Sequence, residues 1–156
     1  MDAAIMDVQA SGLTTREAED RTSLLRSDWL ADLDPIDLEF LVRFAERHTY
    51  EPGSWLFHEG AAREWFGFVI GGEVELVHPR DRSVPVSTLG VGSPLGEGIL
   101  LETRLHTVSA LTRTGAIVLR WPLVALDEIR CARPTVFRRL KVRAAQLTTH
   151  GRSHAG

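Results

Sequence analysis

The sequence predicts a mainly β domain, a barrel or jelly-roll with helices before and after it. Between His48 and Trp121, short apolar or alternating segments are separated by turns rich in glycine and proline. This pattern is typical of the strands of a closed β structure. On both sides of this region, apolar residues recur at helical spacing instead. The length of 156 residues is enough for one domain with a core and a modest extension.

Two helices are predicted before the β region. Thr14 and Glu17 have the spacing of a capping box, so the first helix should run from there to about Leu25. Pro35 suits the first position of a second helix, and the apolar residues after it keep helical spacing to about Arg47. We assign residues 1–27 to an N-terminal extension that contains the first helix.

Seven strands are predicted in the middle of the chain. They are Thr49–Tyr50, Trp55–His58, Trp65–Ile70, Val74–His78, Val84–Leu89, Thr107–Leu111 and Ala116–Trp121. One segment within this series differs, because Leu95–Thr103 opens with glycines and continues with three consecutive aliphatic residues. We expect a turn there, followed by one or two helical turns.

Two more helices are predicted after Pro122. The first covers Leu123–Arg130, and the second starts at Pro134 and continues to about Thr148. The second helix carries an apolar stripe with spacings of three and four residues, made of Phe137, Leu140, Ala144 and Leu147. The main domain is therefore assigned to residues 28–148, and residues 149–156 are expected to form a disordered tail.

Composition and charge exclude several classes of protein. The net charge is −3, so the surface as a whole does not indicate nucleic-acid binding. The basic residues near the C-terminus could be the solvated face of a helix or, less simply, a nucleic-acid patch. No segment is apolar enough for a membrane span or a signal peptide. A single cysteine fits a reducing compartment, so a cytoplasmic location is expected.

The residues that carry chemistry lie in the turn Gly96-Glu97-Gly98 and at Arg104. Flanking glycines allow a close approach of the backbone to a ligand, and free amides at the start of a helix favour anions. Arg104 could face the same concavity with a planar fork that suits phosphate oxygens. A carboxylate beside a phosphate site needs a donor such as a sugar hydroxyl, so the pattern indicates a nucleotide-like ligand.

Here the sequence resembles the cyclic nucleotide-binding domain family over roughly Leu30 to Leu147. The matching residues are spread along the chain: Pro52-Gly53, Phe57, Glu59-Gly60, Phe68-Val69-Ile70, Gly72, Val74, Leu89, Gly92, Gly96-Glu97, Arg104, Thr107-Val108 and Ala110. The resemblance implies an eight-stranded β-roll (double-stranded β-helix) followed by two C-terminal helices. It also implies that Glu97 accepts from the ribose 2′-hydroxyl, that Arg104 pairs with the cyclic phosphate, and that backbone amides around Gly98 and Ile99 add donors.

The sequence departs from the family pattern at several points. The segment from Glu97 to Arg104 is shorter than in well-studied members, and Leu105 and His106 follow the arginine where two small residues are usual. Both stay in the candidate site. Leu105 keeps a backbone N–H but offers no hydroxyl, and its bulk could crowd the phosphate, whereas packing or a hydrogen bond is a simpler role for His106. The last helix resembles that of bacterial transcription regulators of the family, in which it reads the base. Arg143 stands near that position and could stack on a purine or face water.

Two hypotheses for function remain open. The first is a cytoplasmic sensor of cAMP or cGMP, a regulatory module in signal transduction whose C-terminal helix moves when the ligand binds. The second is a degenerate fold without a ligand, acting in protein interaction or as a structural module. No catalytic arrangement supports an enzyme, and no cofactor is implied. The histidines lack the spacing of a metal site. A homodimer through the last helix or an absent effector is conceivable, whereas direct DNA binding is not expected because the chain stops near residue 148.

Overall fold

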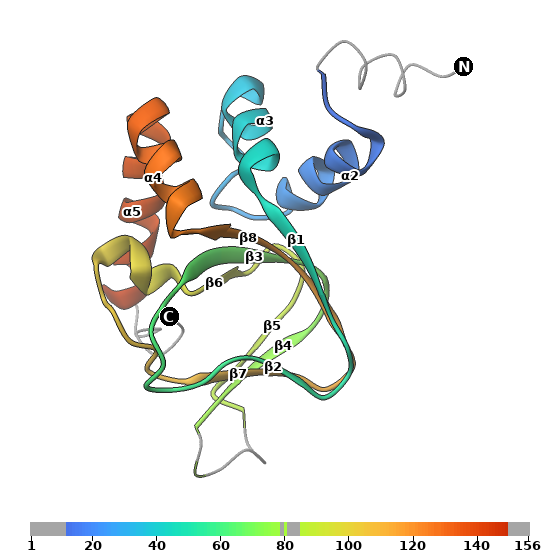
Figure 1. The fold of residues 1–156 in the computed structure, drawn as a ribbon, viewed down its shortest axis with the longest axis vertical. Helices are drawn as coiled ribbons and strands as arrows, with labels where there is room; N and C mark the ends of the chain where they lie inside the picture. Colours follow the sequence, from blue (N-terminus) through green and yellow to red (C-terminus); the bar gives the residue numbers. More distant parts are fainter. Residues whose placement is uncertain (1–11, 79, 81–84, 150–156) are drawn as a thin grey trace.

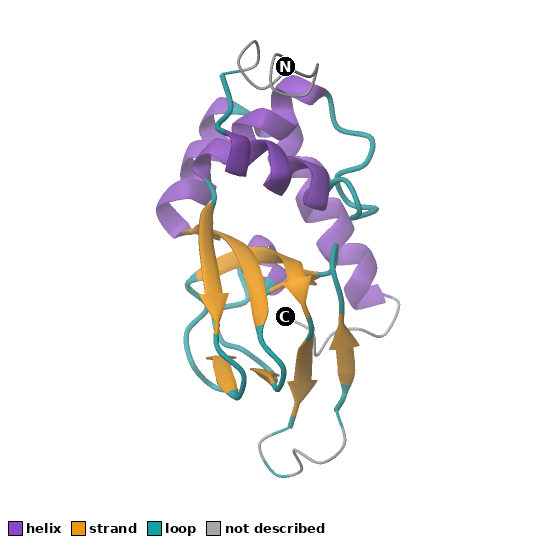
Figure 2. Ribbon diagram, turned by 90° about the vertical axis from the view of Figure 1, so that its right-hand side faces the viewer, coloured by secondary structure: helices purple, strands orange, loops and turns teal. Residues whose placement is uncertain are grey.

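Eight strands form two antiparallel sheets of four strands each, and helices cover one end of this β-roll (Figure 1, Figure 2). In this computed structural model, residues 12–78, 80 and 85–149 are described. The strands are β1 (Glu46–Tyr50), β2 (Ser54–Phe57), β3 (Trp65–Gly72), β4 (Val74–Val77), β5 (Ser87–Leu89), β6 (Pro94–Leu95), β7 (Ser109–Thr112) and β8 (Ala116–Pro122). The helices are α2 (Thr15–Leu24), α3 (Pro35–Phe44), the 3-10 helix η1 (Glu97–Leu101), α4 (Leu123–Ala132) and α5 (Pro134–Thr149).

The sheets pair early strands with late ones, as in a jelly-roll. Their orders are β1-β8-β3-β6 and β2-β7-β4-β5, so β8 lies between β1 and β3, and β7 lies between β2 and β4. Residue pairs far apart in the sequence are therefore neighbours in the sheets, for example Phe66 and Trp121. The predicted mainly β fold, with an eight-stranded roll, N-terminal helices and two C-terminal helices, is confirmed.

The eighth strand, β6, lies where the sequence predicted a turn. Only Pro94 and Leu95 belong to it, and they pair with Phe68 and Gly67 at the edge of the first sheet. Two residues are too few for a periodic pattern to reveal. An edge position also tolerates proline, because its missing N–H is not needed by a further strand.

Helix α3 ends earlier than the apolar spacing predicted. It stops at Phe44 instead of Arg47, because Ala45 is extended (ψ 149°) and the chain then enters β1. Every residue of β1 pairs with a residue of β8, starting with Glu46 opposite Arg120. The hydrogen bonds between β1 and β8 replace those that another helical turn would have made. The apolar spacing of the local sequence carries no information about this distant partner strand, so it predicted a longer helix.

Helix α2 packs into the same core as the roll. Its capping box is formed as predicted, with Glu17 N–H bonded to the Thr14 hydroxyl and Thr14 N–H bonded to the Glu17 carboxylate. Leu24 is fully buried in the cluster that contains residues of β3 and β8. Asp20 forms an ion pair of 2.7 Å with Arg47 of β1. The described part of the N-terminal segment is thus attached to the roll by apolar and polar contacts.

The core joins the helices to the first sheet. Rings of Trp29, Phe66, Phe68 and Trp121 pack with centroids 5.1 to 6.0 Å apart. The indole Nε1–H of Trp121 donates a hydrogen bond of 2.8 Å to the Leu41 carbonyl and fixes α3 on β8. A second cluster fills the interior of the roll between the two sheets. The helical end, to which α4 and α5 belong, is therefore firmly anchored.

Helix α5 buries its apolar stripe within the chain. Val136, Leu140 and Ala144 are almost inaccessible, and Phe137 and Leu147 pack partly buried against the same cluster. The predicted stripe is thus mostly used by the fold, while Val142 remains 51% exposed. Among the described helices, none has the length and apolar character needed to cross a membrane. The tail predicted to be disordered lies, apart from Thr149, outside the described residues.

Candidate functional site

The turn before η1 is shaped by a glycine in the left-handed region. Gly96 has φ 69° and ψ 23°, a conformation that favours glycine, and a Cβ there would lie 2.8 Å from the Trp65 carbonyl oxygen. The chain then forms one short 3-10 helix, Glu97–Leu101, as the glycine-opened segment predicted. Gly96 therefore allows the turn to pack closely against β3.

Next to this turn, Glu97 and Arg63 form a buried charged pair of residues. Glu97 is 4% exposed and Arg63 is 5% exposed. Burial lowers the pKa of the Arg63 guanidinium below its usual value, and the negative charge of Glu97 opposes that change. The guanidinium lies so close to Gly98 that a Cβ there would be 2.6 Å from Arg63 Cζ. Gly98 thus provides the space that Arg63 occupies.

A pocket of about 600 Å³ opens beside η1. Its volume is in the range of small-molecule sites, roughly 300–1,000 Å³. The lining combines aliphatic, cationic, acidic and hydroxyl side chains: Ala62, Arg63, Ile99, Glu102, Thr103, Arg104 and Leu123. We call this space the arginine pocket. It can offer two guanidinium groups to an anion and hydrogen-bonding groups to a hydroxyl.

Hydrogen bonds between two backbone segments hold the two arginines side by side. The Arg63 N–H donates to the Arg104 carbonyl (2.8 Å), and the His106 N–H donates to the Ala61 carbonyl (2.9 Å). Ala62 and Leu105 form an antiparallel bridge between these bonds. The segment before β3 and the segment after η1 are therefore in fixed register, and each presents one arginine to the pocket.

The structure separates the predicted site residues into two groups. Ile99 and Arg104 line the arginine pocket, and Arg104 is exposed and makes no ion pair within the described chain. Glu97 is buried and is not among the residues that line the pocket. Leu105 is 53% exposed and does not line the pocket.

Two further predicted positions lie away from the pocket. His106 is 4% exposed, and its ring stacks on Phe57 with centroids 3.8 Å apart, so its side chain belongs to the interior of the roll. Its backbone N–H donates to the Ala61 carbonyl and is not directed at the pocket. The Arg143 guanidinium of α5 donates a hydrogen bond to the Asp28 carbonyl (3.0 Å), and Arg143 does not line the arginine pocket. Neither residue is brought to Arg104.

Sequence reasoning missed Arg63 and Glu102. Arg63 follows the Glu59-Gly60 turn, where an exposed arginine is the ordinary expectation, and its approach to Gly98 joins segments distant in the sequence. Glu102 adopts φ 62°, the only positive φ of a non-glycine residue in the described chain. A signal was available only for Arg63, because it stands two residues before a strongly apolar strand and such positions can point inward.

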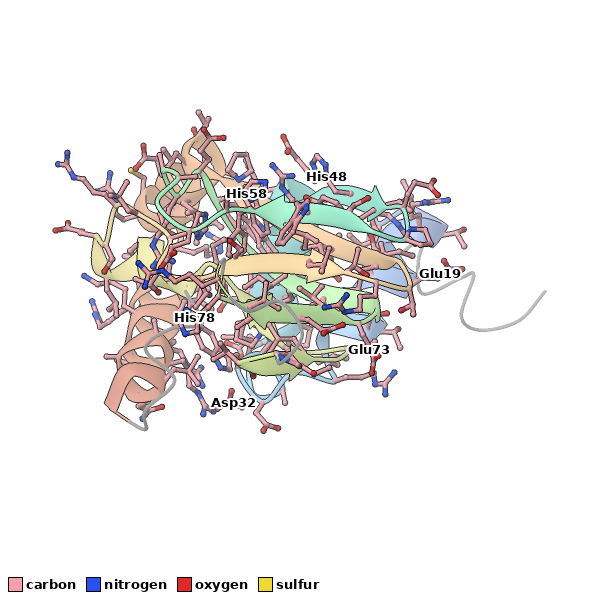
Figure 3. All side chains as sticks on the ribbon, turned by 90° about the horizontal axis from the view of Figure 1, so that it is seen from below. Glu19, Asp32, His48, His58, Glu73 and His78 are labelled. Atoms are coloured by element: carbon pink, nitrogen blue, oxygen red, sulfur yellow. The ribbon has the colours of Figure 1, made fainter. Side chains whose placement is uncertain are left out.

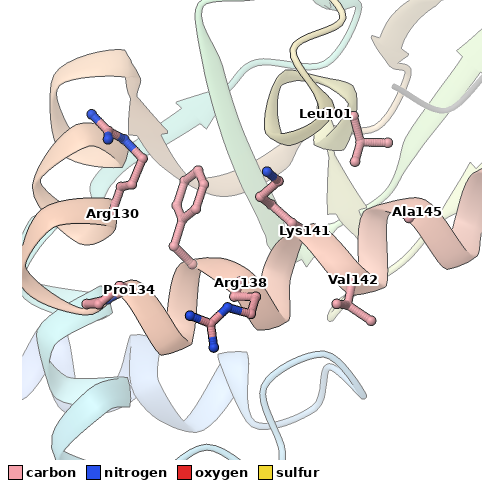
Figure 4. Close-up of a pocket in the computed structure, with 8 residues that line it drawn as sticks. Leu101, Arg130, Pro134, Arg138, Lys141, Val142 and Ala145 are labelled. Carbon is pink, nitrogen blue, oxygen red and sulfur yellow. The ribbon is translucent and has the colours of Figure 1, made fainter.

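A second hollow lies on the exposed side of α5 (Figure 4). Its volume is about 470 Å³. It combines apolar residues with three basic ones: Leu101, Pro134, Phe137, Val142 and Ala145, with Arg130, Arg138 and Lys141. We call it the α5 groove. Leu101 comes from η1, so the same short helix lines the arginine pocket through Ile99 and the α5 groove through Leu101.

The histidines do not gather into a metal site. In Figure 3, His78 lies apart from His48 and His58. In the described ranges, no group of three or more His, Cys, Asp or Glu residues could hold a metal ion.

The comparison with family models decides the family. The model of the cyclic nucleotide-binding domain matches residues 47–130, which is more than half of the chain. This chain belongs to the cyclic nucleotide-binding domain family. The matched region contains the roll, η1 and most of α4.

Solved structures of similar fold agree with the family. The N-terminal domain of a transcriptional regulator from Streptomyces coelicolor is 25% identical with a TM-score of 0.69, and the match covers 85% of this chain and 94% of that one. A cyclic nucleotide-binding domain from Methylobacillus flagellatus is 15% identical with a TM-score of 0.72 and coverages of 90% and 80%. The catabolite activator protein of Thermus thermophilus is 21% identical with a TM-score of 0.70 and coverages of 80% and 59%. A comparison with curated proteins gave no match.

Proposed function

We propose that this cyclic nucleotide-binding domain is a regulatory sensor module that binds cAMP or cGMP in the arginine pocket. The observation that carries the proposal is the position of Arg104. Its exposed guanidinium lines a pocket of suitable volume and is not occupied by an ion pair in the described chain. A guanidinium in this position can bind a phosphate through charge-assisted hydrogen bonds.

The output of the proposed sensor is a movement of α5. Ile99 lines the arginine pocket and Leu101 lines the α5 groove, and both belong to η1. A nucleotide that prefers one position of η1 therefore also selects one arrangement of η1 against α5. The exposed Val142 and the basic groove could then contact a second copy or an effector, in place of the buried stripe.

A second candidate function is a protein-interaction or structural module with no nucleotide. The burial of Glu97 favours it, because a carboxylate that is 4% exposed and outside the pocket lining cannot receive a ribose hydroxyl without a rearrangement. In that case the roll supports the α5 groove and the arginine pocket has no signalling role. The two candidates differ in one measurable property, which is nucleotide affinity.

Isothermal titration calorimetry with cAMP and cGMP tests the proposed function. Micromolar binding by the wild-type protein is expected, and Arg104→Gln should weaken it about ten- to one-hundredfold, since hydrogen bonds to charged groups contribute about 1.5–3 kcal/mol. Arg26→Gln is the matched control, because Arg26 is exposed and lies outside the pocket lining. Absence of heat with either nucleotide would leave the interaction module as the better account.

A further inference from the structure

Arg63 is an arginine in an unusual environment. It is 5% exposed, and its Nε and Nη1 atoms are buried without a hydrogen-bond partner in the described part of the chain. Buried donors of a charged group are normally satisfied, because an unpaired one carries the full cost of desolvation. The negative charge of Glu97 acts on Arg63 but does not remove these unpaired donors.

The position of Arg63 connects it to the arginine pocket. Arg63 lines the pocket together with Arg104, and the backbone hydrogen bond between them keeps the two side chains on neighbouring segments. Its guanidinium lies against Gly98, where any larger residue would collide with it. Arg63 thus lies against Gly98 and lines the pocket, and the charge of Glu97 acts on it.

We propose that Arg63 is a second anion-binding residue of this pocket, and that Glu97 positions Arg63 instead of receiving a sugar hydroxyl. A phosphate ester that enters the pocket accepts hydrogen bonds from both guanidinium groups. To reach it, the Arg63 guanidinium turns away from Gly98 toward Arg104, and its unpaired donors gain acceptors. That the phosphate belongs to a cyclic nucleotide rests on the proposed function, whereas the anion site itself does not.

The charges and hydroxyls of the pocket agree with this assignment. The Glu97 carboxylate offsets the charge of Arg63, and Glu102 offsets that of Arg104, so a phosphodiester would be held by directed hydrogen bonds from the two guanidinium groups and not by a net positive charge. Glu102 and Thr103 also line the pocket and supply an acceptor and a hydroxyl for the sugar. Glu102 is exposed, in contrast to Glu97, so it can meet a ligand without a rearrangement of the turn.

The experiment compares variants of the whole chain in calorimetry with two probes, cAMP and inorganic phosphate. Removing one buried charge alone could unfold the protein, so the double variant Arg63→Gln/Glu97→Gln removes both and keeps the site neutral. Circular dichroism and the midpoint of thermal unfolding check that the variant is folded. Arg63→Lys keeps the charge but loses the planar fork, and Arg26→Gln is the control.

The expected result is at least tenfold weaker binding of both probes by the double variant, with partial recovery in Arg63→Lys. A folded double variant that binds cAMP within twofold of the wild type, while Arg104→Gln loses it, overturns the assignment of Arg63 and leaves the proposed function intact. Phosphate binding that depends on Arg63, without cAMP binding, supports the anion site and rejects the nucleotide sensor. No binding of either probe to the wild-type protein overturns both.

The role of Glu97 has its own readout. If Glu97 positions Arg63, a Glu97→Gln variant that circular dichroism shows to be folded binds cAMP and inorganic phosphate more weakly by similar factors. In the wild type, 2′-deoxy-cAMP then binds nearly as well as cAMP does, and this second measurement does not depend on the folding of a variant. If Glu97 instead accepts from the 2′-hydroxyl, Glu97→Gln weakens cAMP alone and 2′-deoxy-cAMP binds poorly. The second pattern overturns the positioning role.

Discussion

The backbone amide of Arg63 donates a hydrogen bond of 2.8 Å to the carbonyl oxygen of Arg104. This bond joins two segments that are separated in the sequence by the four strands β3 to β6 and by η1. Because their backbones are in register, the pocket geometry depends on the fold of the whole roll. Changes that move either segment should therefore alter both stability and ligand binding.

Substitution of Gly98 by alanine should displace Arg63. The added Cβ would lie 2.6 Å from Arg63 Cζ, so the guanidinium or η1 must shift. Overpacking costs about 1–3 kcal/mol of the free energy of unfolding where the neighbours cannot move. Urea denaturation should show a loss at the lower end of this range, because the guanidinium is the far end of a flexible side chain and can shift. Gly90→Ala is the matched control, because nothing lies within 4 Å of its Cβ position. Equal stabilities for the two variants would contradict the close contact between Arg63 and Gly98.

Features that depend on neighbouring residues were predicted from the sequence better than features that depend on distant ones. The capping box at Thr14 and the helix start at Pro35 follow from neighbouring residues, and both are present. The end of α3 was predicted three residues too late, because β1 pairs with a strand some seventy residues away. The candidate site divides in the same way, since the turn at Gly96 was predicted but the contact between Arg63 and Gly98 was not.

Asp20 should make stability depend on pH with an unusual sign. Burial raises the pKa of Asp20 above its ordinary value of 3.8, and the charges of Arg47 and Arg16 only partly offset this effect. A raised folded-state pKa means that the stabilisation by protonated Asp20 is complete below pH 3.8. This stabilisation is lost as the pH rises through the higher folded-state pKa. The wild-type free energy of unfolding should therefore fall relative to that of Asp20→Asn as the pH rises through this interval.

Urea denaturation of both proteins from below pH 3.8 to neutrality measures this difference. Asp127→Asn is a suitable control, because Asp127 is exposed at the surface beside Arg130. An increase of wild-type stability relative to Asp20→Asn with rising pH would show the opposite. It would mean that the 2.7 Å ion pair with Arg47 outweighs the desolvation of the carboxylate.

Binding of cAMP should slow amide hydrogen exchange in α5 as well as in η1. The ligand is proposed to contact Ile99, whereas Leu101, two residues later on the same 3-10 helix, packs at the α5 groove. A short helix of five residues cannot shift at one end alone, so its two ends respond together. Mass spectrometry of exchange over the Pro134–Thr149 segment measures the response, with Arg104→Gln as the variant that should show none. Protection restricted to the segments that line the arginine pocket would mean that the ligand binds without reaching α5, and the proposed output of the sensor would then have to lie elsewhere on the roll.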